Sequence, residues 1–134
     1  MYKTLAETQM QNHVKLIGFA RDEDLPALYS GAALTAFPSL YEGFGLPILE
    51  SMACGTPVVT ANVSSLPEVA GTAALMVDPY DVRALTDAMR RIISDDVVVE
   101  SLIEDGYAQV KRFTWARAAH QLRGIYAQVL ADTL

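Results

Sequence analysis

Short apolar runs alternate along the chain with stretches that carry apolar residues three and four positions apart. Each of four runs consists mainly of apolar or β-branched residues and stops at a glycine, a proline or a polar residue, which predicts a β-strand. The four predicted strands are residues 14–17, 34–37, 57–60 and 74–77. Because these runs are apolar at most positions rather than alternating, they are typical of a parallel sheet that is covered by helices on both faces.

The segments between and after these runs predict helices. Pro47 suits the first turn of one helix, and Gly55 suits its end. Aspartates at positions 22, 24 and 81 offer N-terminal caps for two others. The expected helices cover residues 25–29, about 47–54, 66–69, 82–92, 97–110 and a last helix after Thr114.

This order of strands and helices predicts an α/β fold with a Rossmann-like parallel sheet. The chain shows no repeat, linker or low-complexity tract, so residues 1–134 are expected to form one domain, with 81–134 as its helical C-terminal section. In the last helix, Trp115, Leu122 and Tyr126 share one face, and this spacing predicts a stripe that faces the core.

Composition narrows the class of protein. Hydrophobic residues make up 51% of the 134 positions, and the charged residues give a formal net charge of −6. The acidic balance argues against nonspecific binding to nucleic acid or to an anionic membrane. The single cysteine, Cys54, excludes an internal disulfide, and no apolar stretch is long enough for a signal peptide or a membrane span. We therefore expect a soluble, cytoplasmic protein.

Residues 38–50 carry the candidate chemistry, because they connect a predicted strand to a predicted helix. Ligands of open α/β sheets bind beyond the carboxyl ends of the strands. Gly43 and Gly45 allow a tight turn there, and the helix that follows directs free N–H groups toward an anion such as a phosphate. A Gly-x-Gly pair alone is equally typical of an ordinary strand-to-helix turn.

Two glutamates flank this turn. Glu42 precedes the glycines, and Glu50 follows them with seven residues between the two glutamates. Taken singly, a loop glutamate is usually solvated, and a glutamate in a first helical turn usually complements the helix dipole. Together, carboxylates on opposite sides of a phosphate site suit a ligand with hydroxyl groups at both ends, which is the form of a nucleotide sugar.

The segment Pro-Ser-x-x-Glu-Gly-Phe-Gly-Leu-Pro-x-x-Glu, residues 38–50, resembles the signature of the retaining GT-B glycosyltransferases of the GT4 type, the glycosyl transferases of group 1. Other segments match the same family in the same order: 14–18, 28–32, 53–59, 66–69, 77–79 and 113–115. The resemblance implies a partial C-terminal, donor-binding domain of an enzyme that transfers a hexose with retention of configuration, in polysaccharide or glycan biosynthesis. The similarity of residues 66–80 to mannosyltransferases favours GDP-mannose over UDP-glucose as the donor.

The resemblance also implies roles for individual residues. Glu50 would accept hydrogen bonds from the ribose, and Glu42 would occupy the catalytic centre as a ligand of the donor-sugar hydroxyls rather than as a nucleophile. Amides of residues 44–46 would stabilise the leaving diphosphate without a metal or other cofactor, and residues 18 and 19 would lie near the nucleobase. The implied donor-binding residues are Gly18, Phe19, Glu42, Gly43, Phe44, Gly45, Leu46 and Glu50.

Some parts of the family pattern have no counterpart in this chain. These are the N-terminal acceptor domain, the strand–loop–helix whose Arg and Lys neutralise the diphosphate, and the strand after it. In a doubly wound sheet of order 3-2-1-4-5-6, the missing pair would separate residues 14–17 from residues 34–37. We therefore expect an element-swapped homodimer or a departure from that order, and no transferase activity from the chain alone.

Two other functions remain open from the sequence: a regulatory or catalytically inactive nucleotide-sugar-binding module, and a GT-B-shaped nucleotide-sugar epimerase. The spacing of Glu42 and Glu50 argues against the epimerase. No metal site is expected, because residues 22–24 (Asp-Glu-Asp) fit a helix start, and His13 and His120 lack partners at ligand spacing.

Overall fold

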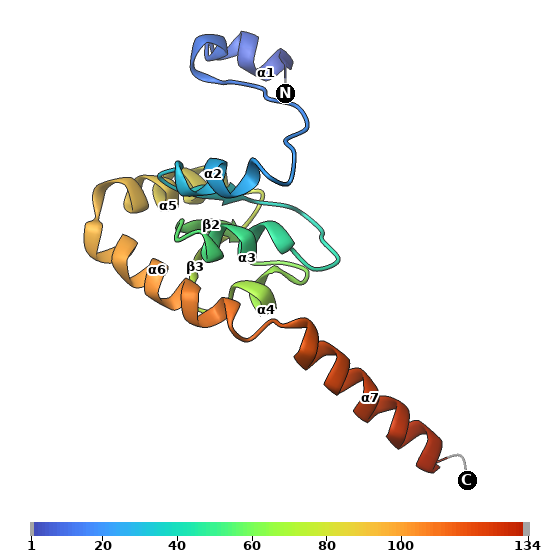
Figure 1. The fold of residues 1–134 in the computed structure, drawn as a ribbon. Helices are drawn as coiled ribbons and strands as arrows, with labels where there is room; N and C mark the ends of the chain where they lie inside the picture. The colour runs from blue at the N-terminus through green and yellow to red at the C-terminus, as the bar shows by residue number, and fades with distance from the viewer. Residues whose placement is uncertain (1, 133–134) are drawn as a thin grey trace.

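A three-stranded parallel sheet lies at the centre of the molecule, in a computed structural model that describes residues 2–132, and the side chains of residues 4–131 (Figure 1). The strands are β1 (Thr35–Phe37), β2 (Val58–Ala61) and β3 (Ala74–Val77), in the order β1-β2-β3. In the register of the sheet, Val58 is the partner of Thr35 on one side and of Ala74 on the other. Three of the four predicted strands are therefore confirmed.

Six helices follow the order that the sequence predicts, and two short ones before them, at residues 2–7 and 11–13, were not predicted. They are α1 (Tyr2–Glu7), the 3-10 helix η1 (Gln11–His13), α2 (Leu25–Ser30), α3 (Leu46–Ala53), α4 (Leu66–Ala70), α5 (Val82–Ser94), α6 (Asp96–Val110) and α7 (Trp115–Asp132). Asp81 caps α5 through its side chain, as expected, and Asp95 caps α6 in the same way. Asp24 stands at the N-cap of α2, but its carboxylate pairs with Arg21 instead, so the expected capping bond is not formed.

Two apolar clusters hold the helices against the sheet. The first joins α3 and α4 to β2 and includes the buried side chains of Ile48, Met52 and Leu66. The second joins α5 and α6 to β2 and β3 and includes Val59 and Ile92. Because every residue of β2 is buried, the sheet has helices on both faces, as a uniformly apolar parallel strand requires. The predicted α/β architecture is thus confirmed.

The prediction of a strand at residues 14–17 is wrong. This segment is extended but pairs with no strand of the described chain, and Val14, Leu16 and Ile17 are 40%, 42% and 54% exposed. A strand needs a neighbour to satisfy its backbone N–H and C=O groups, and residues 2–132 place no strand beside this one. β1 keeps a free edge, and the element-swapped homodimer stays a prediction.

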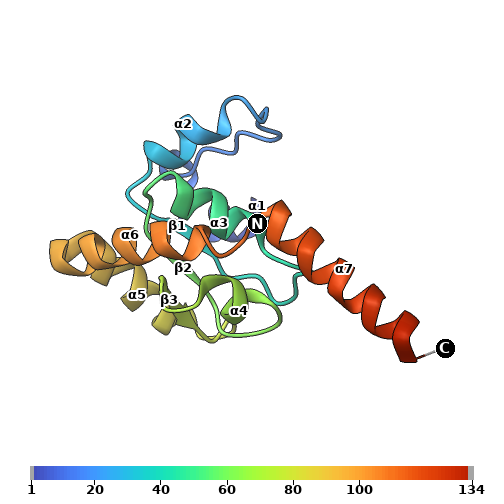
Figure 2. The ribbon, with the colours of Figure 1, turned by 60° about the horizontal axis from the view of Figure 1, so that its bottom comes forward.

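The two ends of the chain lie apart from the sheet. Both views show α7 extending away from the other helices, and Figure 1 shows α1 separated from them by residues 14–20 (Figures 1 and 2). Every described side chain of α7 is exposed, including Trp115 and Tyr126. The prediction that the stripe on this helix faces the core of the chain is therefore wrong. None of the described helices is both long and apolar enough to cross a membrane.

Candidate functional site

The turn before α3 depends on Gly45, which is the N-cap of that helix. Gly45 is buried and has a φ of 105°, a conformation that residues with a side chain rarely adopt. A Cβ at this position would lie 2.9 Å from Cδ2 of Leu66 in the core. At Gly43 the backbone φ is not positive, and a Cβ would meet no atom within 4 Å. Of the two glycines, only Gly45 is required by the turn, contrary to the expectation for Gly43.

The start of α3 presents unused N–H groups. The amides of Phe44, Gly45 and Leu46 form no hydrogen bond with any described residue, whereas the amide of Ile48 donates to the carbonyl of Gly45 over 3.1 Å. Pro47, the second residue of α3, has no N–H to offer. Three adjacent amides at the positive end of a helix dipole can bind an anionic oxygen without a cationic side chain.

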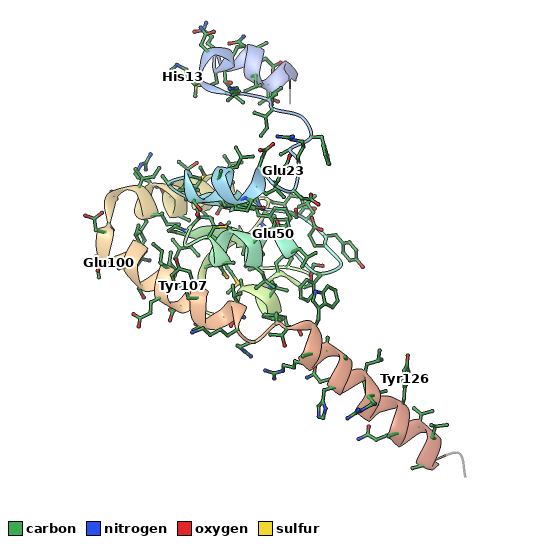
Figure 3. All side chains as sticks on the ribbon, in the orientation of Figure 1. His13, Glu23, Glu50, Glu100, Tyr107 and Tyr126 are labelled. Atoms are coloured by element: carbon green, nitrogen blue, oxygen red, sulfur yellow. The ribbon has the colours of Figure 1, made fainter. Side chains whose placement is uncertain are left out.

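Glu50 lies on α3, in the second turn rather than the first, about 6 Å along the helix axis from its start (Figure 3). Glu50 therefore does not serve to complement the helix dipole at the first turn of α3. Its carboxylate is exposed, and its Oε2 accepts a hydrogen bond from the hydroxyl of Tyr29 over 3.0 Å. Burial, together with this bond and the charge of Glu50, raises the pKa of Tyr29 to about 12, so the phenol remains a donor at neutral pH.

Glu42 is half-buried, and two serines fix its backbone. The hydroxyl of Ser64 accepts from the amide of Glu42 over 3.2 Å and donates to its carbonyl over 2.8 Å. The hydroxyl of Ser65 lies 3.0 Å from the carbonyl of Glu42 and 2.9 Å from that of Phe44. Ser65 is the residue before α4, but its hydroxyl holds this loop and does not cap the helix.

We expect Ser65→Ala to lower the free energy of unfolding by roughly 1 kcal/mol, because two carbonyls would lose their shared donor. Chemical denaturation measures this change. Ser101→Ala is the matched control, since Ser101 is exposed on α6 and should change the free energy by less than about 0.5 kcal/mol. Equal values for the two variants would show that Ser65 does not hold the loop.

The ring of Phe44 also anchors the loop. It packs edge-to-face on Phe113, with ring centroids 5.7 Å apart and an interplanar angle of 81°. Phe113 belongs to the segment between α6 and α7 and packs against the cluster that includes Ile48. The packing of Phe44 on Phe113 therefore fixes the loop before α3, while the amides of residues 44–46 stay unpaired.

Gly18 and Phe19 lie away from this turn in the sequence, at the entry to α2. Gly18 has a φ of 68°, and the side chain of Phe19 is 89% exposed. Phe19 lines a hollow of about 460 Å³ together with Ile17, Asp24 and Leu28. The same helix, α2, carries Tyr29, the partner of Glu50. The expected position of Gly18 and Phe19 near a nucleobase stays a prediction.

Sequence reasoning missed three residues that shape the site: Tyr29, Ser64 and Ser65. Tyr29 lies in a predicted helix among apolar residues, where its ring suggests only packing, although a tyrosine keeps a hydroxyl that needs a partner. The two serines come just before a predicted helix, which indicates a cap and gives no sign of their contacts with Glu42, 22 and 23 positions away. Within the described residues, no three His, Cys, Asp or Glu side chains gather to hold a metal ion.

The sequence is similar to proteins of known activity. It is 47% identical over 113 residues to O-antigen chain mannosyltransferase B of Escherichia coli, a match that covers 84% of this chain and 30% of that protein. It is 36% identical over 133 residues to MMP alpha-(1->4)-mannosyltransferase of Mycolicibacterium hassiacum, covering 96% of this chain and 32% of that protein. The chain therefore spans about a third of the length of these relatives.

Solved structures share the fold over almost the whole chain. Sucrose-phosphate synthase from Thermosynechococcus elongatus superposes with a TM-score of 0.84 and 34% identity, over 98% of this chain and 34% of that one. HepE from Anabaena, solved in complex with UDP and glucose, superposes with a TM-score of 0.84 and 25% identity, over 95% of this chain and 35% of that one. Both are GT-B glycosyltransferases, so the predicted GT-B relationship is confirmed.

The family model described as "Glycosyl transferases group 1" matches residues 1–109, which include β1–β3, the Gly45 turn and both glutamates. A match over this share of the sequence, with relatives of the same kind, is decisive for the family. The chain belongs to the glycosyl transferases of group 1.

Proposed function

We propose that these residues form the donor-binding part of a retaining, GT4-type hexosyltransferase. The observation that carries the proposal is the set of three unpaired amides, at residues 44–46, on the positive end of α3 and between Glu42 and Glu50 in sequence. A nucleoside diphosphate sugar needs an anion site of this kind with hydroxyl acceptors on either side. HepE, solved in complex with UDP and glucose and also in complex with UDP-glucose, supports this ligand class.

In this proposal each group has one task. The amides at residues 44–46 bind the distal phosphate, and their fixed dipoles stabilise the charge that develops on the leaving diphosphate, without a metal. Glu42 binds hydroxyls of the donor sugar, and Glu50 binds the ribose. Gly18 and Phe19 lie beside the base. None of these residues serves as a covalent nucleophile.

The donor sugar follows from the relatives rather than from a residue of the site. The two relatives above are named as mannosyltransferases, which favours mannose, and hence GDP-mannose, over UDP-glucose. The role would be in polysaccharide biosynthesis, on the cytoplasmic side of the cell. Since the chain spans about a third of its relatives, we expect the acceptor to bind residues outside these 134, and the chain alone to bind nucleotide without transferring sugar.

Calorimetric titration of the chain with GDP and with UDP tests the proposal. We expect one of them to bind, and Glu50→Ala to weaken that binding by about 10- to 100-fold, because charge-assisted hydrogen bonds to the ribose are lost. Glu100→Ala removes an exposed carboxylate from α6 and is the matched control, with affinity expected to stay unchanged. If neither nucleotide binds, the donor-site proposal is wrong, and the chain is a remnant without a donor site.

A further inference from the structure

The carboxylate of Glu50 is exposed but already has one fixed partner. Its Oε2 accepts the hydroxyl of Tyr29 over 3.0 Å, and Tyr29 comes from α2, 21 positions earlier in the chain. No described residue forms a hydrogen bond to Oε1 of Glu50. A carboxylate has about four acceptor sites on two oxygens, so the bond from Tyr29 leaves capacity for a further ligand.

The backbone of Tyr29 is itself held in place. Its carbonyl accepts the hydroxyl of Thr56 over 2.7 Å, and the carbonyl of Thr56 accepts the hydroxyl of Ser51 over 3.1 Å. Ser51 and Thr56 are buried, at 0% and 3% exposure. Ser51 directly follows Glu50, and α2 packs against α3. The donor and the acceptor of the Tyr29–Glu50 bond therefore belong to two helices with a buried, hydrogen-bonded connection.

The hydroxyl of Tyr29 keeps its proton and can donate a hydrogen bond at neutral pH. Burial, then the hydrogen bond and charge of Glu50, raises its pKa to about 12 from the ordinary value of 10.0. A raised pKa favours the neutral phenol in the folded chain. The phenol therefore stays neutral and able to donate at neutral pH, and loses its proton only as the pH rises toward about 12.

We propose that Tyr29 is a positioning residue of the donor site, whose hydroxyl orients the Glu50 carboxylate toward the ribose hydroxyls of a nucleoside diphosphate. The inference rests on the proposed function and deepens it. An exposed glutamate otherwise moves among several rotamers, and ordering it on binding costs affinity. Because Tyr29 holds Oε2, the Glu50 side chain is already ordered before the nucleotide binds.

Tyr29→Phe tests the inference, since it removes the hydroxyl and keeps both the ring and the backbone carbonyl that Thr56 binds. We expect it to weaken binding of GDP or UDP, whichever the unaltered chain binds, by roughly 3- to 10-fold. Binding of the corresponding 2′-deoxy nucleotide should change less, because one ribose hydroxyl is already absent. In a Glu50→Ala background, Tyr29→Phe should have no further effect. Tyr126→Phe, on the exposed α7, is the matched control and should bind as the unaltered chain does.

The outcomes separate the inference from the proposed function. If Glu50→Ala weakens binding and Tyr29→Phe does not, the inference is wrong and the donor site stands. The inference also fails if Tyr29→Phe weakens binding equally in the Glu50→Ala background, or affects the ribose and 2′-deoxy forms alike. If the unaltered chain binds neither GDP nor UDP, the proposed function fails and the inference falls with it.

A titration without nucleotide provides a second readout. The ultraviolet absorbance of the phenolate, taken as the difference between the unaltered chain and Tyr29→Phe, reports the ionisation of Tyr29. We expect it to titrate near pH 12, and in Glu50→Gln to titrate at a lower pH, because the negative charge is removed. An unchanged titration in Glu50→Gln would overturn the inference, since the two side chains would then not interact in solution.

Discussion

Gly45→Ala is expected to lower the free energy of unfolding by roughly 2–4 kcal/mol. Two effects add at this position. The backbone has a φ of 105°, which strains any residue with a Cβ. In addition, the new Cβ would lie 2.9 Å from Cδ2 of Leu66, whose side chain is 0% exposed, so the core around it would have to shift. The same displacement would move the amides at the start of α3, so nucleotide binding should be lost as well.

Chemical denaturation measures the stability change, and calorimetry with GDP and UDP measures the binding. Gly43→Ala is the matched control, because it adds the same methyl group two residues earlier, where no atom lies within 4 Å and φ is not positive. We expect its free energy of unfolding to change by less than about 0.5 kcal/mol. If Gly45→Ala and Gly43→Ala were equally stable, the turn would not depend on the conformation of Gly45.

Ile48→Ala should lower the free energy of unfolding by about 2–5 kcal/mol, because it removes three carbons from the core and leaves a cavity. Ile48 is 0% exposed and belongs to the cluster that holds α3 and α4 against β2. It also lies in the first turn of α3, two residues after Leu46. The expected loss therefore reports how strongly the core fixes the end of the helix that presents the amides.

The matched control is Ile93→Ala, which makes the same change on α5 at a side chain that is 68% exposed. Its cost should stay below about 1 kcal/mol. Thermal and urea unfolding, followed by circular dichroism, measure both variants. Similar losses at positions 48 and 93 would contradict the burial of Ile48 and the assignment of α3 to the core.

The sheet and most helices could be predicted because their determinants are local. Residues 57–60 and 74–77 are apolar at nearly every position, and both form parallel strands of the sheet, shifted by no more than one residue. Asp81 and Asp95 directly precede the helices that they cap. In each case the residues that decide the element lie within a few positions of it.

Residues 14–17 and α7 could not be predicted in this way. Residues 14–17 are apolar except at Lys15, but a strand forms only where another strand offers its backbone, and no local pattern contains that information. The stripe of Trp115 and Tyr126 correctly predicted an amphipathic helix. What an apolar face packs against is decided by other parts of a structure, and in this chain nothing among the described residues covers it.

The sequence by itself determined the family, the parallel sheet, and a helix that starts at a glycine turn between two glutamates, because these follow from residues that are near neighbours in the chain. Only the tertiary structure decided which glycine the turn requires, where residues 14–17 lie, and how the two glutamates are held. Gly45 is required because Leu66 of another helix packs against it. The bonds from Tyr29 to Glu50 and from Ser64 to Glu42 span 21 and 22 positions, and such contacts exist only once the helices have packed on the sheet.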